Sequence, residues 1–178
     1  MAAYIAGDAS AFRELFDRYS GVLYRMLLRD LRRPEEARDL VQQTFLHLHR
    51  ARRDFDRRLR FRPWLFTIAV NLKREYFRRV KRRPESSLDA EGAPEPVQAD
   101  HGERTAAQQA IRHALGTLPK DQREVIELHW FDGLSFAEVA EVVGASVAAV
   151  KVRAHRGYVA LRHTLDDRHL AGLPEPEE

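Results

Sequence analysis

The chain has 178 residues, of which 44% are hydrophobic and 32% charged, with no cysteine and a formal net charge of +3. This composition excludes disulfides, thiolate metal sites and a cysteine nucleophile, and no apolar run approaches the ~20 residues of a membrane helix. The first residues lack the basic and apolar segments of a signal peptide, so we predict a cytoplasmic protein without membrane insertion.

Apolar residues recur at three-to-four spacing over the first 84 residues, which predicts amphipathic helices. The first helix carries an apolar stripe that starts at Ala11. The second begins at Pro34, because proline suits the first turn of a helix. The third opens at Pro63 and ends by Pro84. Residues 1–84 therefore form the first predicted domain.

Charge is strongly segregated along the chain. Residues 50–83 contain 14 basic and three acidic side chains, for a net charge of +11. Residues 85–103 carry six acids and no Lys or Arg, and they mix Pro, Gly and Ser without apolar periodicity, which predicts a flexible acidic linker. A short acidic tail, 171–178, ends the chain. The pattern favours a polyanion-binding face followed by an acidic spacer, with a solvated basic surface as the alternative.

The sequence pattern predicts a second helical domain over residues 104–170. One of its helices starts near Pro119, and Ser135 opens an S-x-x-E capping box for a short helix that ends at Gly144. Ser146 can cap a longer last helix. The predicted fold class is therefore all-α, with two small helical domains joined by a flexible linker.

The short helix, the turn at Gly144 and the longer basic helix have the layout of a helix-turn-helix. Val147 and the residues at helical spacing after it are predicted to pack inward. On the outer side, Arg156 suits guanine, while Lys151 and Arg153 suit phosphates. An ordinary helical hairpin with solvated cations is the alternative.

The basic third helix also carries aromatic residues. Cations interleaved with aromatic rings suit single-stranded DNA, because phosphates are neutralised and unstacked bases find ring faces. Core packing is the alternative for each ring, and we expect Phe61 and Trp64 in the core or at its edge.

Four stretches of the chain resemble the sigma-70 family, and within it the sigma factors of the extracytoplasmic-function (ECF) group. Residues 35–46 (EEARDLVQQTFL) and 62–71 (RPWLFTIAVN) are similar to sigma region two. Residues 118–125 (LPKDQREV) and 134–140 (LSFAEVA) are similar to region four. The order and spacing of these motifs are more specific than any one of them.

The resemblance implies roles for particular residues. The first domain would be a sigma region 2 bundle that binds core RNA polymerase through Asp39, Leu40, Gln42, Gln43 and Phe45. The loop from Asp54 to Arg60 would capture a base flipped from the minus-ten element. The residues implied to bind that element are Arg57, Arg58, Arg60, Asn71, Lys73, Arg74, Arg78 and Arg79. The second domain would be a sigma region 4 helix-turn-helix that recognises the minus-thirty-five element through Lys151, Val152, Arg153, His155 and Arg156.

The recognition helix departs from the pattern of the family it resembles. Ala148 and Ala149 replace the usual Gly-Thr, which removes a hydroxyl group. Val152 stands where a serine is common, so base contact there would be apolar, for example to a thymine methyl group. In the region-two motif, Arg38 and Gln43 stand where acids are usual.

The sequence thus predicts a non-enzymatic sigma factor that directs RNA polymerase to promoters and promotes melting. The implied partners are the beta-prime and beta subunits of core RNA polymerase, promoter DNA and an anti-sigma protein. No cofactor or metal is expected, because the eight histidines form no H-E-x-x-H or similar set. The alternatives are a conventional helix-turn-helix transcriptional regulator that binds duplex DNA as a dimer, and a helical interaction protein without a DNA function.

Overall fold

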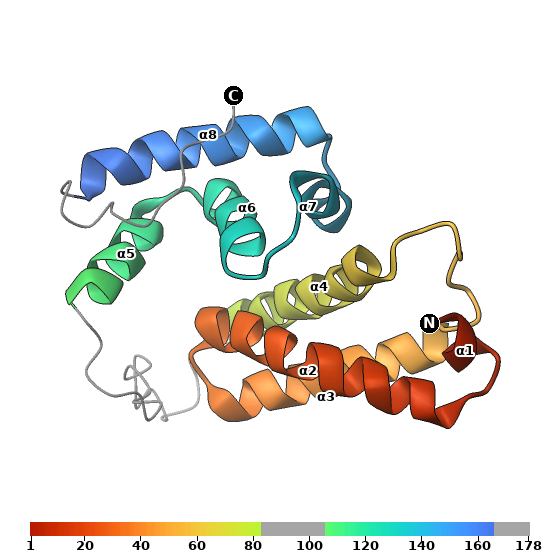
Figure 1. The fold of residues 1–178 in the computed structure, drawn as a ribbon. Helices are drawn as coiled ribbons and strands as arrows, with labels where there is room; N and C mark the ends of the chain where they lie inside the picture. The colour runs from red at the N-terminus through yellow and green to blue at the C-terminus, as the bar shows by residue number, and fades with distance from the viewer. Residues whose placement is uncertain (83–105, 166–178) are drawn as a thin grey trace. The chain divides into compact units, whose positions relative to one another are not determined.

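The structure, a computed structural model, describes residues 1–82 and 106–165. All regular secondary structure in these two ranges is helical, which confirms the all-α class (Figure 1). The chain divides into two compact units, residues 1–97 and 98–178, and each is described by itself. The predicted linker and acidic tail lie outside the described residues.

The first unit is a bundle in which α3 packs against both α2 and α4, and α1 packs against α2. Its helices are α1 (Ala2–Ile5), α2 (Ala9–Leu31), α3 (Pro34–Ala51) and α4 (Phe61–Arg82). The side chains at the centre of this bundle are fully buried, and the largest are Phe66, Leu23, Met26, Leu27, Leu48 and Leu65.

Local signals in the sequence fix where these helices begin and end. Asp8 caps α2, because its carboxylate accepts a hydrogen bond from the backbone N–H of Ser10 at 2.8 Å. Arg32 ends α2 in the left-handed conformation, with φ of 55°, and its N–H donates to the carbonyl of Leu28 at 2.9 Å. Pro34 then occupies the first turn of α3, as predicted.

The second unit is built around α8, against which α5, α6 and α7 all pack. Its helices are α5 (Ala106–Thr117), α6 (Lys120–Trp130), α7 (Phe136–Val143) and α8 (Val147–Thr164). Figure 1 shows α6 and α7 next to each other on one side of α8 (blue). The core residues with almost no exposed surface include Val125, Leu128, Leu134, Val139 and Val150.

The predicted capping box is present at the start of α7. The backbone N–H of Glu138 donates to Ser135 Oγ at 3.3 Å, and Glu138 Oε2 accepts from the N–H of Ser135 at 2.9 Å. Gly144 ends the helix with φ of 69°, which an L side chain rarely adopts. This short helix therefore has fixed ends, and the turn into α8 is set by backbone geometry.

Replacing Ser135 with alanine should lower the free energy of unfolding of the second unit by about 1 kcal/mol, since the helix loses one capped N–H group. The chain has two tryptophans, Trp64 in the first unit and Trp130 in the second. Urea unfolding followed by the fluorescence of Trp130 in a Trp64→Phe background measures this unit. Thr164→Ala removes a hydroxyl that bonds within the last turn of α8 and should change stability by less; equal losses would contradict the capping role.

A half-buried tyrosine links α8 to the end of α6. Trp130 Nε1 donates to the hydroxyl of Tyr158 at 2.5 Å, beside a core cluster that includes Ile126 and Leu161. Burial raises the pKa of Tyr158 above its usual value of about 10, although the hydrogen bond from Trp130 opposes this shift. The folded state therefore prefers the protonated phenol.

The second unit should consequently lose stability as the pH rises past about 10, because the phenol ionises first in the unfolded chain. Urea midpoints of the Trp64→Phe protein between pH 8 and 11 measure the effect. In Tyr158→Phe the fall should be shallower, despite a lower midpoint at pH 8. An unchanged slope would show that other groups cause the alkaline loss.

Candidate nucleic-acid interface

The orientation of α8 about its own axis is fixed by close packing on its inner side. Val150, Ala154 and Leu161 are at most 3% exposed. Gly157 is buried between them, and a Cβ atom there would lie 2.5 Å from Cδ1 of Ile126 on α6. Because α8 can approach α6 this closely only at a glycine, the opposite side of α8 is held towards solvent.

The outer side of α8 carries the residues predicted to contact bases. Val152, His155 and Arg156 are exposed, and Val152 retains 49% of its accessible surface. Ser146 caps the helix, since its Oγ accepts from the N–H of Ala149 at 3.2 Å. The prediction that Val147 packs inward is wrong, because this first residue of α8 is 42% exposed.

The two cations predicted to contact phosphates differ in their surroundings. Lys151 is exposed. Arg153 is half-buried, and its Nε lies 3.4 Å from Oδ2 of Asp121 in the first turn of α6. A contact between Arg153 and a phosphate would have to compete with this ion pair, so Lys151 is the more available of the two.

In the first unit, α4 presents a polar and basic side. Asn71, Arg74 and Arg78 follow at three-to-four spacing and share one side of the helix. Asn71 and Arg78 are exposed and Arg74 is half-buried. Arg79 is also exposed, with its guanidinium carbon 5.8 Å from the centre of the Tyr76 ring. Five of the residues implied to bind the minus-ten element lie on α4, and all but Lys73 have exposed or half-buried side chains.

Lys73 has a different environment from the other cations of α4. It is 7% exposed, and its Nζ donates to Oδ2 of Asp30 at 2.6 Å, which ties α4 to α2. Its ammonium group already has a carboxylate partner in the interior. The structure therefore gives Lys73 a role in packing, and contact with DNA would require breaking this ion pair.

The basic loop between α3 and α4 is anchored by the aromatic ring of Phe55. Phe55 is 9% exposed, and its ring centre lies 4.7 Å from that of Trp64. Phe61 joins the same cluster, so Phe61 and Trp64 line the edge of the core, as expected. The anchored rings hold the loop at the start of α4.

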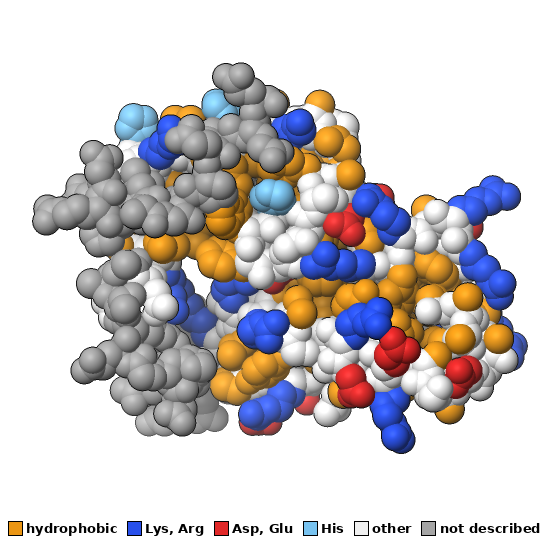
Figure 2. Space-filling model, in the orientation of Figure 1, with side chains coloured by type: hydrophobic (Ala, Val, Ile, Leu, Met, Phe, Trp, Pro, Cys, Tyr) orange, Lys and Arg blue, Asp and Glu red, His pale blue; other side chains and the backbone are white. Residues whose placement is uncertain are grey.

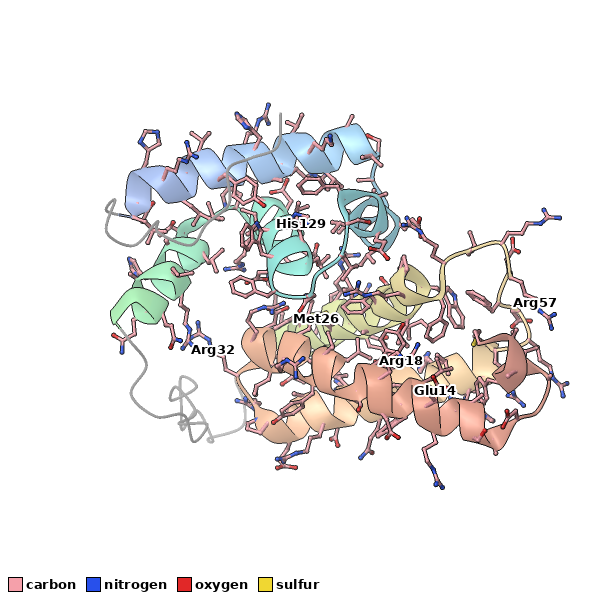
Figure 3. All side chains as sticks on the ribbon, in the orientation of Figure 1. Glu14, Arg18, Met26, Arg32, Arg57 and His129 are labelled. Atoms are coloured by element: carbon pink, nitrogen blue, oxygen red, sulfur yellow. The ribbon has the colours of Figure 1, made fainter. Side chains whose placement is uncertain are left out.

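The far side of this loop is a tight turn that carries exposed arginines. Asp56 Oδ1 accepts from the N–H of Arg58 at 2.9 Å, and the carbonyl of Asp56 accepts from the N–H of Leu59 at 2.9 Å. Arg57, Arg58 and Arg60 are all exposed. Figure 3 shows Arg57 on the outside of the loop, pointing away from the helices of its unit. The face of the molecule drawn in Figure 2 differs from this arginine-rich turn, because acidic and basic side chains are interspersed there among apolar atoms.

The residues implied to dock on polymerase divide into two groups on α3. Asp39, Gln42 and Gln43 are exposed, whereas Leu40 and Phe45 are each 3% exposed. The two buried residues pack the bundle and cannot contact a partner directly. Leu46, which the motif did not single out, is 45% exposed and lies one turn after Gln42 and Gln43.

Among the described residues, no group of three or more His, Asp or Glu side chains is arranged to hold a metal ion. Within the same two ranges, no helix is both long enough and apolar enough to span a bilayer.

Comparison with known sequence families gives two matches in the same order as the two units. Residues 15–83 match the family "Sigma-70 region 2", and residues 108–161 match "Sigma-70, region 4".

Similar proteins match over nearly the whole chain. The RNA polymerase sigma factor CarQ of Myxococcus xanthus is 34% identical, over 92% of this chain and 94% of CarQ. The ECF RNA polymerase sigma factor SigW of Bacillus subtilis is 32% identical, over 90% of this chain and 92% of SigW.

Two solved structures have similar folds. CnrH in complex with the cytosolic domain of CnrY gives a TM-score of 0.68 at 30% identity, over 91% of this chain and 92% of that chain. The sigma factor RpoE in complex with the anti-sigma factor NepR from Bartonella quintana gives a TM-score of 0.67 at 25% identity, over 88% of this chain and 97% of that chain.

Proposed function

Because this chain belongs to the sigma-70 family of RNA polymerase sigma factors, we propose that it binds core RNA polymerase, directs it to promoters and promotes their melting. The observation that carries this proposal is the presence of two separate basic surfaces, one in each sigma region. One is the outer side of α8, and the other is the exposed side of α4 with its preceding loop. Together they suit duplex and single-stranded DNA.

We propose that α8 enters the major groove of the minus-thirty-five element. The capped helix offers Arg156 for a guanine edge, while Lys151 and the helix N-terminus suit phosphates. The close contact at Gly157 supports this assignment, because it keeps the inner side of α8 on its own unit.

We propose that α4 and the loop before it hold the melted minus-ten element. Extruding a base costs a few kcal/mol of unstacking, which contacts to the extruded base must offset. Exposed arginines of the loop would neutralise the neighbouring phosphates, and the amide of Asn71 can hydrogen-bond to a base edge. Lys73 would act in this scheme by positioning α4 through Asp30.

For docking on the beta-prime subunit, the exposed residues of α3 are the candidates. Asp39, Gln42 and Gln43 would make polar contacts, and Leu46, one turn further along α3, would supply apolar area beside them. Leu40 and Phe45 would act by shaping the helix surface from within. The second unit would complete the complex by binding the beta subunit.

An anti-sigma protein is a further proposed partner. The sigma factor RpoE, which has a similar fold, was solved with the anti-sigma factor NepR, and CnrH was solved with the cytosolic domain of CnrY. We expect no catalytic activity from the chain itself, and a cytoplasmic site of action follows from the proposed partners.

Run-off transcription tests the function. Bacterial core RNA polymerase is mixed with the full chain and a library of randomised promoters, and transcripts are sequenced. We expect a defined set of promoters that gives transcripts only when both proteins are present. A conventional regulator would instead bind duplex DNA tightly without polymerase. Absence of transcripts, together with absence of core binding, would overturn the proposal.

A further inference from the structure

We propose that α8 recognises thymine methyl groups in the minus-thirty-five element, and that Val152 is the specificity-determining residue. This inference rests on the function proposed above and names the chemistry by which the second DNA surface selects its sequence.

The first step is the position of Val152 on the helix. Val150 and Ala154, each two positions away, are 0% and 1% exposed and face the core. Since consecutive helical residues are separated by ~100°, Val152 lies about opposite to both. It is 49% exposed, and Ala148, one turn earlier, is exposed as well. Along the line of α8 opposite the core, the first two turns therefore carry methyl groups, at Ala148 and Val152, and the exposed His155 follows them.

The second step is what such a surface can recognise. In the major groove, thymine presents a C5-methyl group, and no other base does. The isopropyl group of Val152 has no donor or acceptor. Pressed against guanine, adenine or cytosine, it would remove water from polar groups and leave them without partners, which is costly. The same side chain thus attracts thymine and disfavours the other bases.

The third step is the charge around this apolar line. Lys151 precedes Val152, and Arg156 follows it by one turn, and both are exposed. A methyl-lined ridge bordered by cations matches a groove that is bordered by phosphates. An apolar protein partner would leave these cations without counter-charges, so DNA is the occupant that fits both features.

The test replaces thymine with deoxyuridine, which removes only the methyl group. Each thymine of the minus-thirty-five element in a promoter selected by the holoenzyme is replaced in turn, and holoenzyme binding is measured. At one or two positions we expect affinity to fall about fourfold, the effect of one buried methyl group. In Val152→Ser, which removes both methyl groups of the side chain, the same replacement should change affinity by less than about twofold.

Val159→Ala is the matched control, because Val159 is 42% exposed on the same side of α8 but two turns farther from the capped end. This variant should keep the fourfold sensitivity. Unchanged affinity of the unmodified protein at every deoxyuridine position would overturn the inference and leave the proposed function intact, as would full sensitivity in Val152→Ser. If no promoter is selected at all, both fail.

Discussion

Replacing Asp30 with alanine should lower the free energy of unfolding of the first unit by about 3 kcal/mol, because it leaves the ammonium of Lys73 buried without its carboxylate. The two side chains are only 9% and 17% exposed, and their charged atoms lie 2.6 Å apart. Urea unfolding followed by Trp64 fluorescence in a Trp130→Phe background measures this unit alone.

A matched surface pair provides the control. Glu14 and Arg18 lie 2.5 Å apart on α2, but their side chains are 68% and 60% exposed (Figure 3). Glu14→Ala should cost less than about 0.5 kcal/mol, since water screens exposed pairs. Lys73→Met tests the same ion pair by removing the other partner. If the double variant Lys73→Met/Asp30→Leu regains stability, apolar packing can replace the ion pair. Equal small losses from Asp30→Ala and Glu14→Ala would contradict the structural role assigned to Lys73.

Replacing Arg156 with alanine should reduce discrimination at one base pair of the minus-thirty-five element by about 5- to 150-fold, equivalent to 1–3 kcal/mol for a bidentate contact. The loss should be confined to promoters that carry the preferred base, because a phosphate contact would not distinguish them. Holoenzyme binding to a set of promoters with all four bases at each position measures this.

Lys151→Ala is the comparison that separates base contact from phosphate contact. It should weaken binding to all promoters by a similar factor and lower the slope of log affinity against log salt by about 1. If Arg156→Ala instead gives a uniform loss with a reduced salt slope, then Arg156 contacts a phosphate and another residue selects the base.

Helix boundaries were predictable where the signal lies within a few residues. Pro34 and the capping box of Ser135 begin helices as expected. The third predicted helix begins earlier than expected, at Phe61, because its first turn is held by the aromatic cluster around Phe55. Helix α1 was not predicted at all, since its buried residue is Tyr4, which packs on Phe12 and shares a hydrogen bond with a histidine 45 positions away.

The candidate site was predictable in residue type but not in exposure. Motif similarity named Leu40 and Phe45 together with their exposed neighbours, since a motif does not distinguish a contacting residue from one that shapes the helix from within. Lys73 belonged to a run of cations, and its partner, Asp30, lies 43 positions earlier in the chain. Burial and long-range ion pairs depend on how helices pack, which local spacing does not encode.

The close contact between α8 and α6 at Gly157 has a consequence for how the DNA sequence preference of this protein could be changed. Because this contact holds the inner side of α8 on its unit, the residues on the exposed side contribute little to folding. Substitutions at Ala148, Val152 and Arg156 should therefore change the free energy of unfolding little, while they alter which DNA sequences are bound. Stability and sequence preference can then change independently, on opposite sides of a single helix. New promoter sets become accessible through a few surface substitutions, in evolution as in the laboratory.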